Sequence, residues 1–436
     1  MKRFILLSLL LLAAAGLSAQ EPVDVAALRA HIGQVMPQSV RVHPEEDETL
    51  IGLPYPYSVP AIRGAMQEMY YWDTYYTNLG LLSLGDIEQA KNNAADILYL
   101  IGKMGYMPNG SHKSLLSRSQ PPYACLIVRD IYEKTGDKEW LAACLPALEK
   151  EYEFWMTERI APNGLNRYGH QPLTDEEIDG FFQAIASRLG ADTAIPADAR
   201  ISQGRHWLAE AESGWDFDPR FDRRCLDFNP LDLNANLYIY ETTMARFCKE
   251  LGRDGTRQWK QRARTRRRLI RKYCLNRADG LFYDYDYVNG RHSEVLSGAI
   301  FNLMNAGLLT RRQARKVCKA LPRLELEFGI AACEKGGPER PFTYQWDYPN
   351  AWGAVNCMAV KGLDRYGFQE DARRIARKYV ESNVRQFKGT GMLFEKYNAL
   401  TGWQDAASEY GTPGNFMGWT AGTFLFCADY LYRQHP

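Results

Sequence analysis

The chain has almost no net charge, since its 436 residues include 53 Lys and Arg against 52 Asp and Glu. Such a balance supplies no general electric field to attract a nucleic acid, so we expect no nucleic-acid partner. None of its nine cysteines forms a Cys-x-x-Cys pair, which argues against a zinc site and a dense disulfide framework. We predict small buried thiols and no metal site, with a single disulfide as the alternative in an exported chain.

The apolar run at the N-terminus is too short for a confident membrane span. It extends from Phe4 to Leu17 behind two basic residues and gives way to polar residues after Ala19. This pattern predicts a secretory signal cleaved after Ala19, with a non-cleaved anchor as the alternative. The first cysteine is Cys125, far from that point, so a lipoprotein anchor is disfavoured. We expect a periplasmic or secreted protein without a stable membrane anchor.

Past residue 60 the dominant pattern is helical and comes in pairs. Asp86 is placed to cap a helix whose apolar residues recur at steps of three and four as far as Ile101. Joints near residues 131–140, 247–255 and 364–371 each end one amphipathic run with Gly and open another, as αα-hairpins do. Their spacing is too irregular for a short-period solenoid. We predict an all-α closed toroid in a single domain, 60–436, behind a signal, 1–19, and an N-terminal extension, 20–59.

Three stretches interrupt the helical pattern. Residues 162–206 are rich in polar residues and proline, which predicts one long loop or a short lid around Asp175–Leu189. Aromatic residues and Asp between Gly280 and Gly290 predict a short strand or hairpin. From Arg253 to Lys272 ten of twenty residues are Lys or Arg. We interpret this run as a solvated outer helix, with a site for an anionic polymer as the alternative.

Aromatic residues stand beside carboxylates, amides and guanidinium groups in a few dense segments. These segments are Glu68–Tyr76, Pro108–Pro122, Ala211–Phe217, Tyr344–Pro349, Phe394–Tyr397 and Glu409–Tyr410. Buried charges are costly unless paired, so such clusters predict a polar cleft. Aromatic rings stack on the C–H faces of sugars, and polar side chains exchange hydrogen bonds with the hydroxyls. We expect a neutral small sugar as ligand, with Trp72, Trp215 and Trp346 stacking on it.

Cleavage of a glycosidic bond requires two carboxyl groups with different roles. One gives a proton to the leaving oxygen, and the other activates water or attacks the sugar directly. On chemistry alone the comparable candidates are Asp73, Asp216, Asp347, Glu395 and Glu409. Each of them has a structural alternative, because ion-pair networks and helix caps also hold carboxylates.

Six blocks in this order resemble glycoside hydrolase family 37, the trehalases. They are Tyr71-Trp72-Asp73, Asn109 to Pro122, Glu212-Ser-Gly-Trp-Asp-Phe217, Gln345-Trp-Asp-Tyr-Pro349, Glu395-Lys-Tyr397 and Gly418-Trp-Thr-Ala-Gly422. The resemblance spans roughly residues 60–425. It implies an (α/α)6 barrel that hydrolyses an α-glucoside with inversion and without a cofactor, trehalose being the default substrate. We expect the enzyme to be a monomer.

The resemblance also implies roles for individual residues. Asp216 would be the general acid and Glu395 the general base. Gly214 would offer its backbone near the acid, and a closed apolar pocket around Trp215 and Phe217 would raise the pKa of Asp216. The remaining sugar-binding positions are Trp72, Asp73, Asn109, Arg118, Ser119, Gln120, Trp346 and Glu409.

The sequence departs from the family pattern in several sugar-binding elements. Ala65 stands where the family has Arg, with Arg63 two residues earlier, and no Arg-Pro-Glu motif is found between Tyr168 and Glu210. Asn398 replaces the Asp that follows Glu-Lys-Tyr in the family, and the run before Glu409 is not glycine-rich. These losses leave two alternatives to trehalose hydrolysis. One is hydrolysis of another α-glucoside or oligosaccharide, and the other is sugar binding without catalysis.

Overall fold

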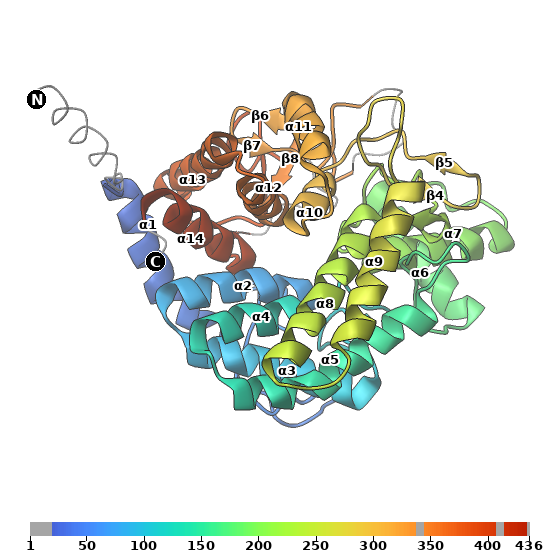
Figure 1. Ribbon diagram of the computed structural model, residues 1–436, viewed down its shortest axis with the longest axis horizontal. Coiled ribbons are helices and arrows are strands. Elements are labelled where there is room, and N and C mark those ends of the chain that lie inside the picture. The colour runs from blue at the N-terminus through green and yellow to red at the C-terminus, as the bar shows by residue number, and fades with distance from the viewer. Residues whose placement is uncertain (1–19, 337–343, 407–413, 434–436) are drawn as a thin grey trace, which may run out of the picture.

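Six inner helices surround a common axis in the computed structural model, which describes residues 20–336, 344–406 and 414–433 (Figure 1). Each inner helix packs against the next, and the last packs against the first, so the ring is closed. The inner helices are α2 (Tyr71–Leu84), α4 (Ala124–Thr135), α8 (Leu231–Glu250), α10 (Ile300–Asn305), α12 (Gly353–Arg365) and α14 (Gly418–Tyr432). The outer layer consists of α1 (Val23–Val35), α3 (Ile87–Met104), α5 (Lys138–Glu158), α9 (Thr256–Tyr273), α11 (Arg311–Ala320) and α13 (Gln369–Thr390). The predicted all-α (α/α)6 barrel is confirmed.

The segment 20–59, predicted as an N-terminal extension, carries the outer helix α1. This helix packs against α13 and α14 and buries Val25, Leu28 and Ile32 in the main core. It thereby covers the seam where the first and last inner helices meet.

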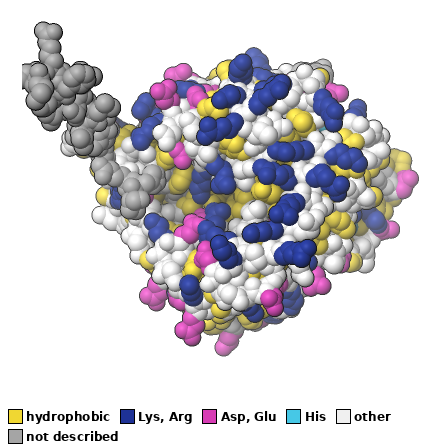
Figure 2. Space-filling view, viewed as in Figure 1, with side chains coloured by type: hydrophobic (Ala, Val, Ile, Leu, Met, Phe, Trp, Pro, Cys, Tyr) yellow, Lys and Arg dark blue, Asp and Glu magenta, His cyan; other side chains and the backbone are white. Residues whose placement is uncertain are grey.

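The outer helices form where the periodicity places them. Asp86 caps α3 by accepting a hydrogen bond from the backbone N–H of Gln89, and the predicted apolar face from Ala90 to Ile101 is buried. The three predicted hairpin joints separate α4 from α5, α8 from α9, and α12 from α13. The basic run is α9, an outer helix that packs against α8, and Lys and Arg side chains are spread over the face of the molecule viewed in Figure 2. This agrees with a solvated outer helix.

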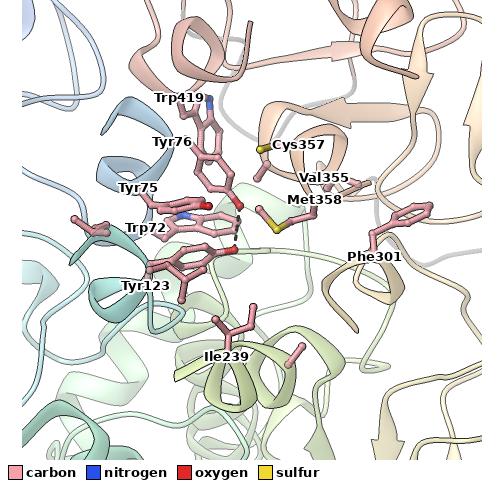
Figure 3. Close-up of a cluster of buried hydrophobic side chains, with 14 of the residues drawn as sticks. Trp72, Tyr75, Tyr76, Tyr123, Ile239, Phe301, Val355, Cys357, Met358 and Trp419 are labelled. Atoms are coloured by element: carbon pink, nitrogen blue, oxygen red, sulfur yellow. Dashed lines mark hydrogen bonds between the residues drawn. The ribbon is translucent and has the colours of Figure 1, made fainter. Parts of the chain in front are cut away.

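The interior of the ring is filled with aromatic and sulfur-containing side chains. Trp72, Tyr75 and Tyr76 of α2 meet Tyr123 and Met358 near the axis (Figure 3), and the hydroxyls of Tyr76 and Tyr123 are 3.0 Å apart. The nine cysteines lie in the described ranges, carry no disulfide there, and eight of them are buried. Part of the high tyrosine content therefore fills the core.

Residues 162–206 hold a helical hairpin. Helix α6 (Asp175–Leu189) coincides with the predicted lid, and α7 (Ala197–Glu212) follows it, which the sequence interpretation missed. The hairpin has a small core of its own, in which Phe182, Ile185 and Trp207 contact Phe217 and Tyr344. We call α6 and α7 the helical lid.

The strands are short and pair in four small sheets. They are β1 (Val40–Arg41) with β2 (Tyr57–Ser58), β3 (Phe228–Asn229) with β4 (Tyr285–Asp286) and β5 (Arg291–His292), β6 (Glu325–Leu326) with β7 (Gly329–Ile330), and β8 (Asn350–Trp352) with β9 (Lys396–Asn398). The hairpin of β4 and β5 confirms the strand predicted between Gly280 and Gly290. Within the described residues, no helix is both long and apolar enough to cross a membrane.

Candidate active site

A cavity of about 280 Å³ lies at the end of the ring where the inner helices begin. Its lining includes nine of the residues predicted from the sequence: Trp72, Asp73, Asn109, Arg118, Gln120, Gly214, Asp216, Trp346 and Glu395. Positions that lie more than 300 residues apart in the chain thus meet at one place. Arg188, Gln345, Trp352 and Trp419 also line it.

Asp216 lies in the loop that follows α7, beneath the helical lid. Burial raises the pKa of its carboxyl, and the guanidinium groups of Arg188 and Arg118 oppose that rise. The Nη2 atom of Arg188 is 3.6 Å from a carboxylate oxygen of Asp216. The backbone carbonyl of Asp216 accepts a hydrogen bond from the side-chain amide of Gln345. Asp216 is therefore oriented both through its backbone and through its charge.

Glu395 immediately precedes β9, far along the chain from Asp216. The ammonium group of Lys396 is 2.6 Å from its carboxylate, and both side chains are almost fully buried. Pairing of β8 with β9 sets Lys396 opposite Trp352, with the ammonium 5.0 Å from the centre of the indole ring. This short, buried contact to Lys396 fixes the position of the Glu395 carboxylate at the cavity.

Asp73, in the first turn of α2, is the third carboxyl group of the cavity. Burial and the nearby charge of Glu395 raise its pKa to about 8. At neutral pH this carboxyl is mostly protonated and can donate a hydrogen bond. The three carboxyl groups of the site thus have three different environments.

Four tryptophans, Trp72, Trp346, Trp352 and Trp419, line one side of the cavity, and we call them the aromatic wall. Trp346 and Trp352 are stacked with ring centres 3.8 Å apart, and Trp72 lies 5.6 Å from Trp346. Trp215 was predicted to stack on the sugar, but it is not among the lining residues. It lies behind Trp346, with ring centres 4.9 Å apart, and carries the guanidinium of Arg220 on its ring.

The polar lining residues are held by the loop that precedes α4. The backbone N–H of Asn109 donates to the carbonyl oxygen of Arg118, and the side-chain oxygen of Gln120 accepts from the backbone N–H of Trp72. Desolvation lowers the pKa of the half-buried Arg118 guanidinium, and Asp216 and other nearby acidic groups oppose that shift. This loop therefore ties the guanidinium and amide groups to the first turn of α2.

One of the predicted residues, Ser119, is placed differently. Ser119 does not line the cavity, because its hydroxyl donates to the backbone oxygen of Met107 and its side chain is fully buried. Glu409 lies outside the described residues. Ser119 contributes instead through its backbone N–H, which donates to Glu212.

The sequence interpretation missed two charged residues of the site. Arg188 is in the last turn of α6, outside all six blocks, and no local signal distinguishes it from a solvent-facing helical arginine. Glu212 is the first residue of the third block and is fully buried. We call its carboxylate and the groups that it binds the buried clamp. Its carboxylate pairs with both the Nε and Nη2 atoms of Arg159, at 2.8 and 2.9 Å, and accepts the backbone N–H groups of Ser119 and Gly169.

The sequence matches the trehalase family over residues 18–431. The chain belongs to the trehalase family. It is a glycoside hydrolase of the trehalase type, as its resemblance to glycoside hydrolase family 37 predicted.

Relatives of this trehalase-family chain include periplasmic trehalases from two Xanthomonas strains. It is 31% identical over 425 residues to the one from Xanthomonas oryzae pv. oryzae (strain MAFF 311018) and 32% identical over 430 residues to the one from Xanthomonas axonopodis pv. citri (strain 306). Each alignment covers 92% of this chain and 72% of the relative. The periplasmic location that these names carry agrees with the export predicted from the N-terminus.

Among solved structures, neutral trehalase Nth1 from Saccharomyces cerevisiae is 28% identical, with a TM-score of 0.75, and the match covers 92% of this chain and 80% of that one. A family 63 mannosylglycerate hydrolase from Thermus thermophilus shares the fold at 19% identity and a TM-score of 0.67, over 92% of this chain and 99% of that one. The barrel is thus shared beyond trehalases.

The departures from the trehalase pattern change which side chains reach the cavity. Arg63 and Ala65 are exposed on the loop before α2, and neither lines the cavity. Asn398 ends β9, and its side-chain oxygen accepts the backbone N–H of Leu400 in the following turn. Among the described residues, the guanidinium groups that do line the cavity belong to Arg118 and Arg188.

Proposed function

We propose that the protein hydrolyses trehalose to two glucose molecules with inversion, using Asp216 as general acid and Glu395 as general base. The observation that carries this proposal is the shared cavity, which brings the two carboxyl groups together with the aromatic wall. The names of the relatives support trehalose as the substrate.

The environments of the two carboxyl groups support their different roles. Burial favours the protonated form of Asp216, which a general acid requires. The ammonium of Lys396, 2.6 Å from the carboxylate of Glu395, would hold that carboxylate in place to accept a proton from water. In the proposed step Glu395 accepts a proton from water while the water oxygen bonds to the anomeric carbon. The glycosidic C–O bond breaks, and the leaving oxygen takes the proton of Asp216.

The other lining residues would bind the sugar. The aromatic wall presents indole faces to the C–H groups of the glucose rings, and the amides of Asn109 and Gln120 exchange hydrogen bonds with hydroxyls. Asp73 would donate one hydrogen bond at neutral pH, because its pKa is raised to about 8. A site that pairs specific hydroxyls discriminates strongly against ligands that lack them.

The alternative function is hydrolysis of another α-glucoside or an α-linked oligosaccharide. The observation that favours it is the position of Arg63 and Ala65 outside the cavity. A third possibility, sugar binding without catalysis, is disfavoured because a binding protein has no need of an acid and base pair.

The test is hydrolysis of trehalose and a panel of α-linked glucosides by the mature chain, with the first anomer followed by NMR. We expect trehalose to be the best substrate and β-glucose to appear beside α-glucose. Asp216→Asn and Glu395→Gln should each lower kcat by about a thousandfold or more, while the exposed control Asp175→Asn keeps wild-type rates. Turnover of both active-site variants near the wild-type rate would reject the assigned roles, and a preference for another glucoside would select the alternative.

A further inference from the structure

Arg188 connects the helical lid to the carboxyl group of Asp216. Its guanidinium is 3.6 Å from that carboxylate, and both side chains are about 30% exposed, which places the pair at the mouth of the cavity. The same guanidinium lies 5.5 Å from the centre of the Phe217 ring. One side chain of α6 therefore contacts two consecutive residues of the loop that carries the proposed acid.

The lid is packed onto the site at further points. Its small core includes Phe217, which follows Asp216, and Tyr344, which precedes Gln345. Gln345 in turn donates to the backbone oxygen of Asp216. The guanidinium of Arg118 lies 5.5 Å from the ring of Phe181 on α6. A displacement of α6 would thus move the acid, the amide that orients it and an arginine of the cavity.

We propose that Arg188 is a positioning residue for Asp216, and that it sets the highest pH at which this carboxyl still delivers its proton to the leaving oxygen. This inference rests on the proposed function of Asp216 as general acid. It assigns the helical lid a part in the chemistry, although α6 lies outside every block that the sequence shares with the family.

The sign of the effect follows from the charges that face Asp216. These groups are Arg188 of α6, Arg118 of the loop before α4, Glu395 before β9, Asp73 of α2 and Tyr70 at the start of α2. Of these, the two arginines favour the deprotonated carboxylate, and burial favours the protonated acid. Removing the charge of Arg188 removes one of the two guanidinium groups that lower the pKa of Asp216. The carboxyl then keeps its proton to higher pH. The alkaline limb of the activity profile then moves upward.

A cation in the last turn of a helix also has a simpler role, because it offsets the partial negative charge of the helix C-terminus. That role would alter the stability of α6 and lower activity equally at every pH. The position of the alkaline limb therefore separates the two roles. Arg188→Lys keeps the positive charge, and Arg188→Gln removes it at similar size.

The experiment measures kcat/KM for trehalose from pH 5 to 9 in wild type, Arg188→Gln, Arg188→Lys and Arg205→Gln. Arg205 is the matched control, because it belongs to the same lid and makes an exposed ion pair with Asp175. For Arg188→Gln we expect the ratio of kcat/KM at pH 8 to that at pH 6 to rise by about threefold or more. Arg188→Lys and Arg205→Gln should keep the wild-type ratio.

Two further measurements separate this inference from the proposed function. With α-glucosyl fluoride, whose leaving group needs no proton, Arg188→Gln should show no shift of the limb. If Asp216→Asn hydrolyses trehalose normally, the proposed function fails whatever Arg188 does. If Asp216→Asn is inactive and the limb of a folded Arg188→Gln stays at the wild-type pH, the positioning role of Arg188 is overturned and the proposed function stands.

Discussion

Gly214 shows how closely the proposed acid loop approaches the aromatic wall. Its φ angle is +72°, and a Cβ atom there would lie 2.8 Å from Cε2 of Trp72. A side chain would need both a rarely populated backbone conformation and a displacement of the indole ring. Only glycine satisfies both constraints without strain.

We predict that Gly214→Ala lowers kcat/KM for trehalose by about tenfold or more, because small displacements of reacting groups are costly. The matched control is Gly136→Ala, since Gly136 has a φ of +64° at the end of α4 with open space around it. Both variants should lose about 1 kcal/mol or more of stability in thermal unfolding, but Gly136→Ala should keep its activity. Equal activity of the two variants would contradict this account.

Asp73 couples the stability of the fold to pH. Its pKa is about 8 in the folded protein, against an ordinary value of 3.8. Between these pH values the folded state holds a proton that the unfolded state has released. Stability from this group is therefore complete below pH 4 and is lost as the pH rises to about 8, by at most about 1.4 kcal/mol per pH unit.

Asp73→Asn keeps the shape of the neutral side chain and removes its titration. We expect the difference in melting temperature, variant minus wild type, to be larger at pH 8 than at pH 5. The control Asp175→Asn, on the exposed face of α6, should shift the melting temperature equally at both pH values. A constant difference for Asp73→Asn would mean that its carboxyl is already ionised at pH 5.

At the scale of elements, the end of α7 holds the loops of the site together. Glu212 is fully buried there, where it pairs with Arg159 and accepts two backbone N–H groups from the segments at Ser119 and Gly169. Breaking a buried pair leaves an uncompensated charge, which costs about 3–5 kcal/mol.

We predict that Glu212→Gln loses stability of this order in thermal unfolding and also loses activity, because the loop with Arg118 is no longer anchored. Glu133→Gln is the control: Glu133 pairs with Arg246 at 2.7 Å, but both side chains are exposed. Glu133→Gln should lower the free energy of unfolding by between zero and about 1 kcal/mol. If both variants melted alike, the clamp would have no structural role.

The sequence predicted those elements whose pattern is formed by residues close together in the chain. The capped helix α3, the hairpin joints and the β4–β5 hairpin were predicted, because caps, glycines and periodicity are properties of neighbouring residues. Helix α7 was missed, since its apolar residues contact α6 and the site loops and follow no simple stripe. The partners of Arg188 and Glu212 belong to other elements, and no short-range pattern reveals such pairs.

In the basic run on α9, a single side chain likewise has a partner that the local sequence does not reveal. Its predicted exposure is correct for most of its residues, but Arg266 is buried and its Nε donates to Glu241 at 2.8 Å. The periodicity of α9 places Arg266 on the same face as Trp259, Ala263 and Ile270. The partner lies on α8, so only the packing of the two helices explains an arginine on that face.

At the scale of the whole molecule, each end of the ring holds a cavity. The inner helices begin at the active-site cavity, and their N-terminal partial positive charges favour carboxylates there. They end around a second cavity of about 870 Å³, whose lining includes Lys361, Arg365 and Arg433 together with Asp130, Glu133 and Asp429. Cations at helix C-termini offset the partial negative charge of those ends. Both ends of the ring therefore carry charged side chains of both signs, in keeping with the near-zero net charge of the chain.

Ring closure depends on the crossing of α2 and α14, the first and last inner helices. A Cβ on Gly422 would lie 1.9 Å from the backbone oxygen of Tyr76, and one on Gly80 would lie 2.8 Å from Cα of Gly422. The two backbones therefore touch without intervening side chains. This contact also positions Trp419, which lies one turn before Gly422 and belongs to the aromatic wall.

We predict that Gly422→Ala destabilises the protein by about 3 kcal/mol or more, because α14 must move away from α2 to admit the methyl group. Gly102→Ala is the control, as Gly102 lies inside α3 with open space at its Cβ position. This change should stabilise the protein by up to about 1 kcal/mol through helix propensity. Calorimetry should give melting temperatures on opposite sides of wild type, and the activity of Gly422→Ala should fall with its stability as Trp419 shifts. An unchanged melting temperature for Gly422→Ala would mean that the ring closes without this contact, and that α1 and α13 hold α14 in place by themselves.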